Sequence, residues 1–241
     1  MMNLNEYENK IINADCLDIL RKLPDKCVDL VLTDPPYGIN YQSSRRINKC
    51  SKITNDNNLN WLPIILSELK RISKDTAIWY IFCSWHHIDK FKQEIDKIKH
   101  IKNILIWNKN NFGFGDLKCD FSPKYEMIFF CNEHTPLNGK RIANVLNFAK
   151  SNNSLHPTQK PLDLFETLIW KASQPNDLIL DCFSGSGTTA VAAHKLGRRF
   201  ICIEKDPDYW AASIKRLEEA RKQISFFELP QNKKLTTKGI A

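Results

Sequence analysis

The sequence predicts an α/β fold: a doubly wound, mostly parallel sheet with helices on both faces. Short apolar runs alternate along the chain with stretches of helical character. The runs are continuously apolar, as in VDLVLT (28–33) and EMIFFC (126–131), which is typical of strands covered on both sides. Residues 178–204 read strand, helix, strand, which is a βαβ unit and is right-handed by default.

The individual elements follow from these patterns. The apolar runs place strands at 28–33, 78–83, 104–107, 126–131, 178–182 and 200–204. The stretches between them place helices at 59–72, 161–173, 188–196 and 207–224. The last helix has a clear start, because Asp206 can cap it and Pro207 suits its first turn. Gly197 follows the helix at 188–196, where a left-handed residue commonly ends a helix.

Composition describes a globular protein. The 241 residues are 42% hydrophobic and 26% charged, which excludes a disordered chain. Lys and Arg number 35 against 27 Asp and Glu, and the net charge of +8 favours a polyanionic partner. The sequence lacks a secretory signal and an apolar run of about 18 residues, so we expect a cytoplasmic protein with no membrane partner. The eight cysteines form no Cys-x-x-Cys pair, so we expect free, mostly buried thiols and no metal site.

Two long polar segments interrupt a chain that otherwise forms one domain over 1–241. They lie at about 38–60 and 132–155, and loops of this length in a compact domain are usually functional or mobile. The alternative is that both are solvated surface excursions. Their basic residues include Arg45, Arg46, Lys49, Lys52, Lys140 and Arg141.

The motif Asp34-Pro35-Pro36-Tyr37 directly follows the expected strand at 28–33. Ligands of parallel α/β sheets lie beyond the carboxyl ends of the strands. Two successive prolines stiffen the backbone, so the carboxylate of Asp34 and the carbonyl of Pro35 form a rigid pair of acceptors. With the ring of Tyr37 beside them, these acceptors suit a planar group that carries an NH2. The alternative is a proline-rich turn whose Asp merely caps it.

A second motif, DCFSGSGTT (181–189), ends a strand and opens a helix. Its small residues let a ligand approach the main chain, and the helix N-terminus offers free N–H groups. It lacks the Gly-Lys-Ser/Thr of a P-loop and the third glycine of the dinucleotide fingerprint. Glu204 ends the next strand, where an acid can accept both ribose hydroxyls of an adenosine. The motif supplies these candidate cofactor residues: Asp181, Phe183, Ser184, Gly185, Ser186, Gly187, Thr188 and Thr189.

Together, TDPPYG (33–38) and FSGSGTT (183–189) resemble the S-adenosylmethionine-dependent DNA adenine-N6 methyltransferases of restriction–modification systems. The order, with DPPY before the glycine loop, is that of the family's β group. HPTQKP (156–161) resembles the element before the cofactor helix, and CIEKD (202–206) resembles the ribose-binding strand end. The resemblance covers about residues 11–222 and implies a Rossmann-like methyltransferase fold with a permuted motif order.

The resemblance also implies roles for single residues. Asp15 and Cys16 match the segment whose acid and following amide meet the cofactor adenine, and Glu204 with Lys205 matches the ribose site. We expect Lys160 to contact the cofactor carboxylate or the floor of the active site; otherwise it is a solvated lysine at a helix start. Asp34 and Pro35 would hold the amine of a base flipped out of duplex DNA, while Tyr37 stacks on it.

The basic residues of the two polar segments would then contact DNA phosphates or guanine edges. A cytosine-N4 methyltransferase is the nearest alternative, but such enzymes usually resemble Ser-Pro-Pro-Tyr where this chain has Asp34. A catalytically silent DNA-binding module is a further alternative. A cognate restriction endonuclease and a homodimer are partners that the resemblance suggests.

Overall fold

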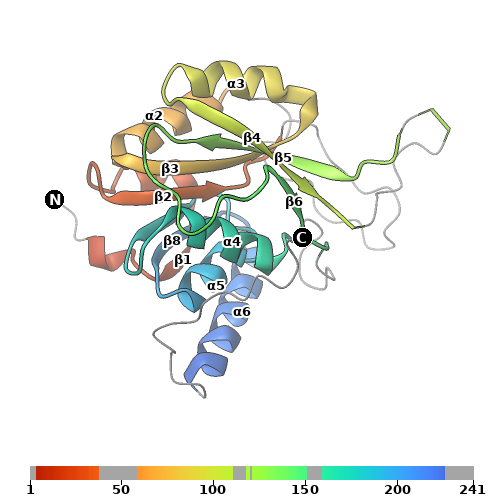
Figure 1. Cartoon of the computed structure of the whole chain (residues 1–241). Coiled ribbons are helices and arrows are strands. Elements are labelled where there is room, and N and C mark those ends of the chain that lie inside the picture. The colour runs from red at the N-terminus through yellow and green to blue at the C-terminus, as the bar shows by residue number, and fades with distance from the viewer. Residues whose placement is uncertain (1–3, 38–58, 111–117, 120, 151–158, 226–241) are drawn as a thin grey trace.

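Eight strands of the computed structural model form one sheet in the order β1-β8-β7-β2-β3-β5-β4-β6 (Figure 1). The structure describes residues 4–37, 59–110, 118–119, 121–150 and 159–225. The strands are β1 (Lys10–Asn13), β2 (Val28–Thr33), β3 (Ser73–Cys83), β4 (Ile101–Asn108), β5 (Tyr125–Cys131), β6 (Val145–Asn147), β7 (Leu178–Asp181) and β8 (Arg199–Glu204). Only β5 runs against its neighbours, so the sheet is mostly parallel as predicted.

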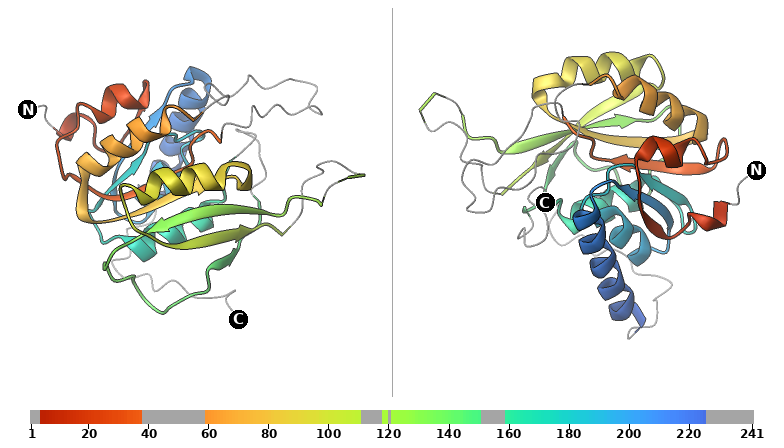
Figure 2. Two further views of the ribbon diagram at one scale, coloured as in Figure 1. Left: turned by 90° about the horizontal axis from the view of Figure 1, so that it is seen from above. Right: turned by 180° about the vertical axis from the view of Figure 1, so that it is seen from behind.

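Helices cover both faces of this sheet, which confirms the predicted doubly wound class (Figures 1 and 2). On one face lie α1 (Cys16–Leu20), α2 (Leu62–Ile72) and α3 (Ile88–Asp96). On the other lie α4 (Leu162–Ala172), α5 (Thr188–Lys195) and α6 (Pro207–Ser225). Two short 3-10 helices, η1 (Leu4–Glu6) and η2 (Trp85–His87), complete the described elements.

The strands alternate their side chains between these two helical layers. Val31 and Trp79 pack with α2, whereas Leu30 and Tyr80 pack with α4 and α5. All four side chains are almost fully buried, so both faces of the central strands lie in apolar surroundings. This burial explains why the strands read as continuous apolar runs in the sequence.

All six predicted strands and all four predicted helices are present, with boundaries that differ by up to five residues. The largest difference is at β3, which begins at Ser73 and not at 78, because the polar residues Lys74–Thr76 also have extended backbone. The analysis missed β1, β6, α1 and α3. The strand β6 lies inside the segment 132–155 that was expected to be a loop.

The helix boundaries signalled by sequence are confirmed. Asp206 Oδ1 accepts hydrogen bonds from the backbone N–H groups of Asp208 (2.9 Å) and Tyr209 (3.1 Å), which caps α6. Gly197 has φ = +68° just after α5, as expected of a left-handed C-terminal residue.

The described cysteines are all free, and most are buried. Cys16, Cys83, Cys131, Cys182 and Cys202 are buried, Cys27 is half-buried and Cys119 is exposed. Within the ranges that the structure describes, no helix has the length and apolar character required to cross a membrane.

Candidate active site

The two sequence motifs meet where β2 and β7 end side by side. Thr33, the last residue of β2, donates its hydroxyl to Asp181 Oδ1 at 3.0 Å. The backbone N–H of Cys182 donates to Thr33 Oγ1 at 3.3 Å. Asp34 follows Thr33 directly, so its carboxylate lies beside the start of the glycine loop.

Asp34 is held by one partner on each carboxylate oxygen. The Tyr37 hydroxyl donates to Oδ1 at 2.5 Å, and the Lys160 ammonium donates to Oδ2. The Lys160 side chain is only 7% exposed, so it lies in the floor of the site and is not a solvated lysine. Pro35 is buried directly after Asp34, and Pro36 and Tyr37 are half-buried.

Burial and the charge of the neighbouring groups act in opposite directions on the pKa values of Asp34 and Lys160. Burial raises the pKa of Asp34 above its ordinary value, while Lys160 and Tyr37 act to lower it. Burial alone would lower the pKa of Lys160, but the carboxylates of Asp34 and Glu126 outweigh it and raise that pKa. Burial, followed by the charge of Asp34, raises the pKa of Tyr37 well above its ordinary value. Lys160 is therefore a firm cation and Tyr37 a neutral donor.

A second carboxylate, Glu126, lies at the start of β5 and extends this group. Its Oε2 is 3.1 Å from the Lys160 ammonium, and its Oε1 is 2.7 Å from the ammonium of Lys109. Burial opposes the charge of Glu126, but the two ammonium groups prevail and lower its pKa. The sequence analysis missed Glu126 and Lys109, because no local spacing relates them to Lys160.

Glu204 and Asp181 hold the glycine loop in place through hydrogen bonds. Glu204 accepts the N–H of Gly185 at Oε2 and the N–H of Asp206 at Oε1, both at 2.8 Å. Asp181 accepts the N–H of Phe183 at 3.1 Å and the hydroxyl of Thr189. Burial is the main cause that raises the pKa of Asp181, to about 7.

The loop side chains point partly into the protein. Arg216 of α6, which the sequence analysis did not single out, donates to the Ser186 carbonyl at 3.1 Å and to Thr188 Oγ1 at 2.9 Å. Ser184 Oγ is buried and has no hydrogen-bond partner among the described residues. Glycines at 185 and 187 have positive φ, at +49° and +74°.

The segment after β1 joins the same edge of the sheet, because β1 pairs with β8. Asp15 caps α1 through the N–H of Leu17 at 3.0 Å, and its Oδ2 accepts from the Lys205 ammonium at 3.0 Å. Cys16 begins α1 and is buried. The structure therefore brings Asp15, Cys16, Glu204 and Lys205 together beside the glycine loop.

Comparison with known proteins gives the family. A family model described as DNA methylase, of the N6/N4 type, matches residues 28–147 and 138–215. The chain belongs to the N6/N4 DNA methylase family.

Two relatives align with most of this methylase. The type II methyltransferase M.HinfI of Haemophilus influenzae is 31% identical over 268 residues, covering 94% of this chain and 73% of the relative. The DNA adenine methyltransferase YhdJ of Escherichia coli (strain K12) is 28% identical over 268 residues, covering 96% and 90%.

Solved structures confirm the Rossmann-like fold of this methylase. The M1.HpyAVI–SAM complex aligns with a TM-score of 0.67 and 26% identity, covering 86% of this chain and 99% of that chain. The cytosine-N4-specific PvuII DNA methyltransferase aligns with a TM-score of 0.71, covering 89% and 92%. It is only 17% identical, so this second likeness shows the fold alone.

Of the basic residues expected to contact DNA, the structure describes only Lys140 and Arg141. Arg45, Arg46, Lys49 and Lys52 lie outside the described residues. Lys140 and Arg141 are exposed, and the Lys171 ammonium donates to the carbonyls of Asn138 (2.9 Å) and Lys140. Lys171 is in the last turn of α4, whose 11 residues span about 16 Å, whereas Lys160 precedes the first turn. Lys140 therefore lies at the end of α4 that is remote from Asp34.

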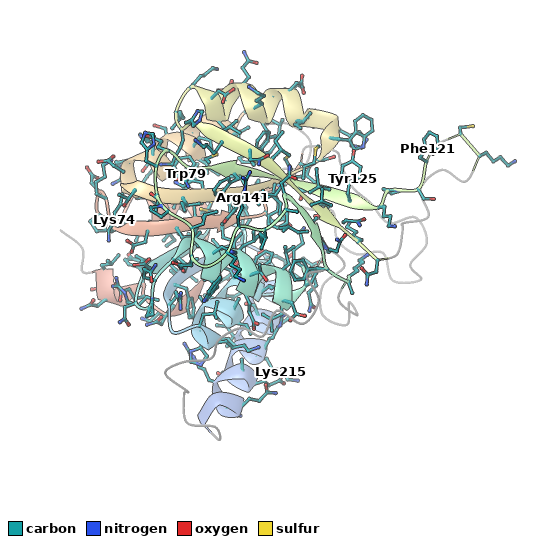
Figure 3. All side chains as sticks on the ribbon, viewed as in Figure 1. Lys74, Trp79, Phe121, Tyr125, Arg141 and Lys215 are labelled. Atoms are coloured by element: carbon teal, nitrogen blue, oxygen red, sulfur yellow. The ribbon has the colours of Figure 1, made fainter. Side chains whose placement is uncertain are left out.

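An arm that extends from the β4–β5 edge of the sheet is a further feature of this methylase. The strands β4 and β5 continue into it, with the Lys109 N–H donating to the Lys124 carbonyl at 2.8 Å. Tyr125 is 47% exposed at its base and Phe121 is 95% exposed further out (Figure 3). The arm therefore carries the aromatic side chains of Phe121 and Tyr125 and the basic side chain of Lys124 beyond the end of the sheet that holds Glu126.

Proposed function

We propose that this DNA methyltransferase transfers a methyl group from S-adenosylmethionine to the N6 amino group of adenine in duplex DNA. The observation that carries the proposal is the Asp34 carboxylate, fixed by Tyr37 and Lys160 at the end of β2 and adjacent to the glycine loop after β7. The printed name of YhdJ, a DNA adenine methyltransferase, favours adenine as the target.

The residues beside the glycine loop fit S-adenosylmethionine. Glu204 and Asp15 offer carboxylates at the ends of β8 and β1, suited to ribose hydroxyls and to an adenine. The buried Ser184 hydroxyl has no protein partner in the described part of the chain, and a bound ligand would satisfy it. M1.HpyAVI, with 26% identity, was solved with this cofactor. When bound, S-adenosylmethionine supplies a methyl group attached to a positively charged sulfur.

Asp34 is the proposed catalytic residue, because it can accept a hydrogen bond from the exocyclic amine of the target base. The Pro35 carbonyl would accept the second N–H, and the two bonds would orient the nitrogen lone pair away from both oxygens. Positive charge develops on that nitrogen during transfer, and the anionic Asp34 stabilises it electrostatically. Pro36 stiffens the turn, and the ring of Tyr37 offers a stacking surface for the flipped base.

The same acceptors also suit the N4 amine of cytosine, which is the second candidate. The N6/N4 family model does not distinguish the two amines, and an Asp at position 34 favours adenine. For DNA binding we propose the segments 38–60, with Arg45, Arg46, Lys49 and Lys52, and 132–155, with Lys140 and Arg141. A cognate restriction endonuclease, like that implied by the type II name of M.HinfI, and pairing of two copies are further proposals.

The test is to incubate the protein with duplex DNA and S-adenosylmethionine labelled in the methyl group, and then to digest the DNA to nucleosides. We expect the label on N6-methyladenine. In Asp34→Ala, labelling should fall by at least about a hundredfold, as is typical when an electrostatic stabiliser is removed, while cofactor binding measured by calorimetry persists.

Label on N4-methylcytosine would replace adenine by the second candidate. No labelled base, with DNA binding retained, would support a catalytically silent DNA-binding module. Full activity of Asp34→Ala would overturn the assignment of Asp34.

A further inference from the structure

Lys160 is shared between two carboxylates in the floor of the candidate active site. Its ammonium donates to Asp34 Oδ2 and lies 3.1 Å from Glu126 Oε2. The two acids come from different strands, β2 and β5, and Lys160 precedes α4. Three distant parts of the chain therefore converge on one buried cation.

Alternating charges continue beyond Glu126. Lys109, just after β4, lies 2.7 Å from Glu126 Oε1, and its ammonium is 5.0 Å from the centre of the Trp107 ring. The side chains of Glu126 and Lys109 are 22% and 17% exposed, so solvent screens this pair only partly. The series Asp34, Lys160, Glu126, Lys109 has no net charge, which lets all four groups stay ionised in a buried place.

The charges of this series affect how strongly the Asp34 carboxylate can accept a hydrogen bond. A lysine bound to Asp34 alone would direct its full charge at that carboxylate and weaken it as an acceptor. With Glu126 Oε2 3.1 Å away on its other side, the Lys160 ammonium directs its charge at two carboxylates. The carboxylate of Asp34 then keeps more of its acceptor strength for a further donor.

We propose that Glu126 is a positioning residue of the methyl-transfer reaction: it offsets part of the charge that the Lys160 ammonium directs at Asp34, so that Asp34 remains a strong acceptor for the amine of the target base. The inference rests on the proposed function, because it requires Asp34 to meet an amine. Glu126 acts through Lys160 and itself touches neither the base nor the cofactor.

The other titratable groups around Asp34 have defined states. Tyr37 from the same loop and Cys83 at the end of β3 have raised pKa values, chiefly because they are buried, and both stay neutral. Asp181 at the end of β7 titrates near pH 7, but substitutions at 109 or 126 leave it in place. A difference between variants in their pH profiles therefore reports the charge balance on Lys160 and Asp34.

Two substitutions should shift the pH profile in opposite directions. Glu126→Gln removes a negative charge that raises the pKa of Asp34, so the acid limb of the transfer rate should move to lower pH by about one unit. The plateau rate should fall about threefold, because a weaker base is a weaker acceptor. Lys109→Met leaves the charge of Glu126 uncompensated, so the acid limb should move to higher pH.

The measurement is the single-turnover rate of methyl transfer as a function of pH, with cofactor affinity measured by calorimetry for each protein. Glu166→Gln is the matched control, since the half-buried Glu166 on α4 pairs with the more exposed Lys195 of α5, at 2.5 Å. We expect its profile to coincide with that of the wild type. Thermal unfolding of each variant verifies that it is folded.

Opposite shifts for Glu126→Gln and Lys109→Met, with unchanged cofactor affinity, would support the positioning role. Coincident acid limbs, or a loss of rate in Glu126→Gln that follows only a loss of folded protein, would overturn it. Failure of the positioning role can be distinguished from failure of the proposed function. A wild-type protein that labels no base overturns the proposed function before any variant is compared.

Discussion

Asp181 illustrates how a single buried carboxylate can make stability depend on pH. It is only 3% exposed, and its two oxygens accept hydrogen bonds from the Thr33 hydroxyl, the Phe183 N–H and the Thr189 hydroxyl. These donors favour the charged form, but burial prevails and raises the pKa from 3.8 to about 7. The folded state therefore holds this proton more tightly than the unfolded state does.

The sign of the effect follows from that difference. Between about pH 4 and pH 7 the folded protein binds more protons at position 181, so this residue makes the protein less stable as the pH rises. Asp181→Asn cannot ionise. Its free energy of unfolding, relative to that of the wild type, should increase from pH 4 to pH 7 by at most about 4 kcal/mol. Urea unfolding of both proteins at several pH values measures this, and a constant difference would contradict the assigned ionisation of Asp181.

At the scale of an element, α5 is bounded by two glycines in the left-handed region. Gly187 has φ = +74° at its start and Gly197 has φ = +68° just after its end. The two sites differ in their surroundings. A Cβ at Gly187 would lie 2.9 Å from the Cβ of Ser213 and 3.1 Å from Ile11 Cδ1, whereas a Cβ at Gly197 would have no neighbour within 4 Å.

This contrast yields a paired prediction. Gly197→Ala should cost about 1 kcal/mol of stability, from backbone strain alone. Gly187→Ala adds an overlap with α6 and β1, and should cost about 1–3 kcal/mol more. Chemical denaturation of the two variants compares these costs. Equal losses of stability in the two variants would mean that α6 and β1 make room for the added Cβ at position 187 at no cost in free energy.

The elements that the sequence predicts well are those with long apolar patterns. The strands β2, β5 and β8 are buried on both faces, so packing and local preference agree. The missed elements lack such a pattern. The strands β1 and β6 have only four and three residues, and α3 buries only Phe91 and Ile95. Tertiary pairing creates these elements, and a local pattern does not reveal it.

The residues of the candidate site also divide into those that the sequence predicts and those that it does not. Asp34 and the glycine loop were predictable because contiguous residues carry them. Lys160 was predicted to contact the cofactor carboxylate or the floor of the site, and the structure pairs it with Asp34 in a buried place. Glu126 and Lys109 could not be predicted, because their relation to Lys160 exists only after β4, β5 and β2 share a sheet.

At the scale of the whole molecule, the net charge of +8 bears on DNA binding. Contacts with phosphates release counterions, so the affinity for DNA should fall steeply as salt increases. If about four phosphates are neutralised, affinity should fall about a hundredfold between 50 and 200 mM salt. Fluorescence anisotropy with a labelled duplex measures this dependence. An affinity that is insensitive to salt would contradict a role for the basic residues.

The pairing of β1 with β8 has a consequence for biosynthesis. Asn13 and Glu204 are adjacent in the sheet although 191 positions separate them along the chain. Closing so long a loop costs entropy, and the contact can form only when the ribosome has released both segments. The strands β2, β3, β4 and β5 can pair earlier. The edge that brings Asp15 beside Glu204 is thus completed late, when most of the described chain has been translated.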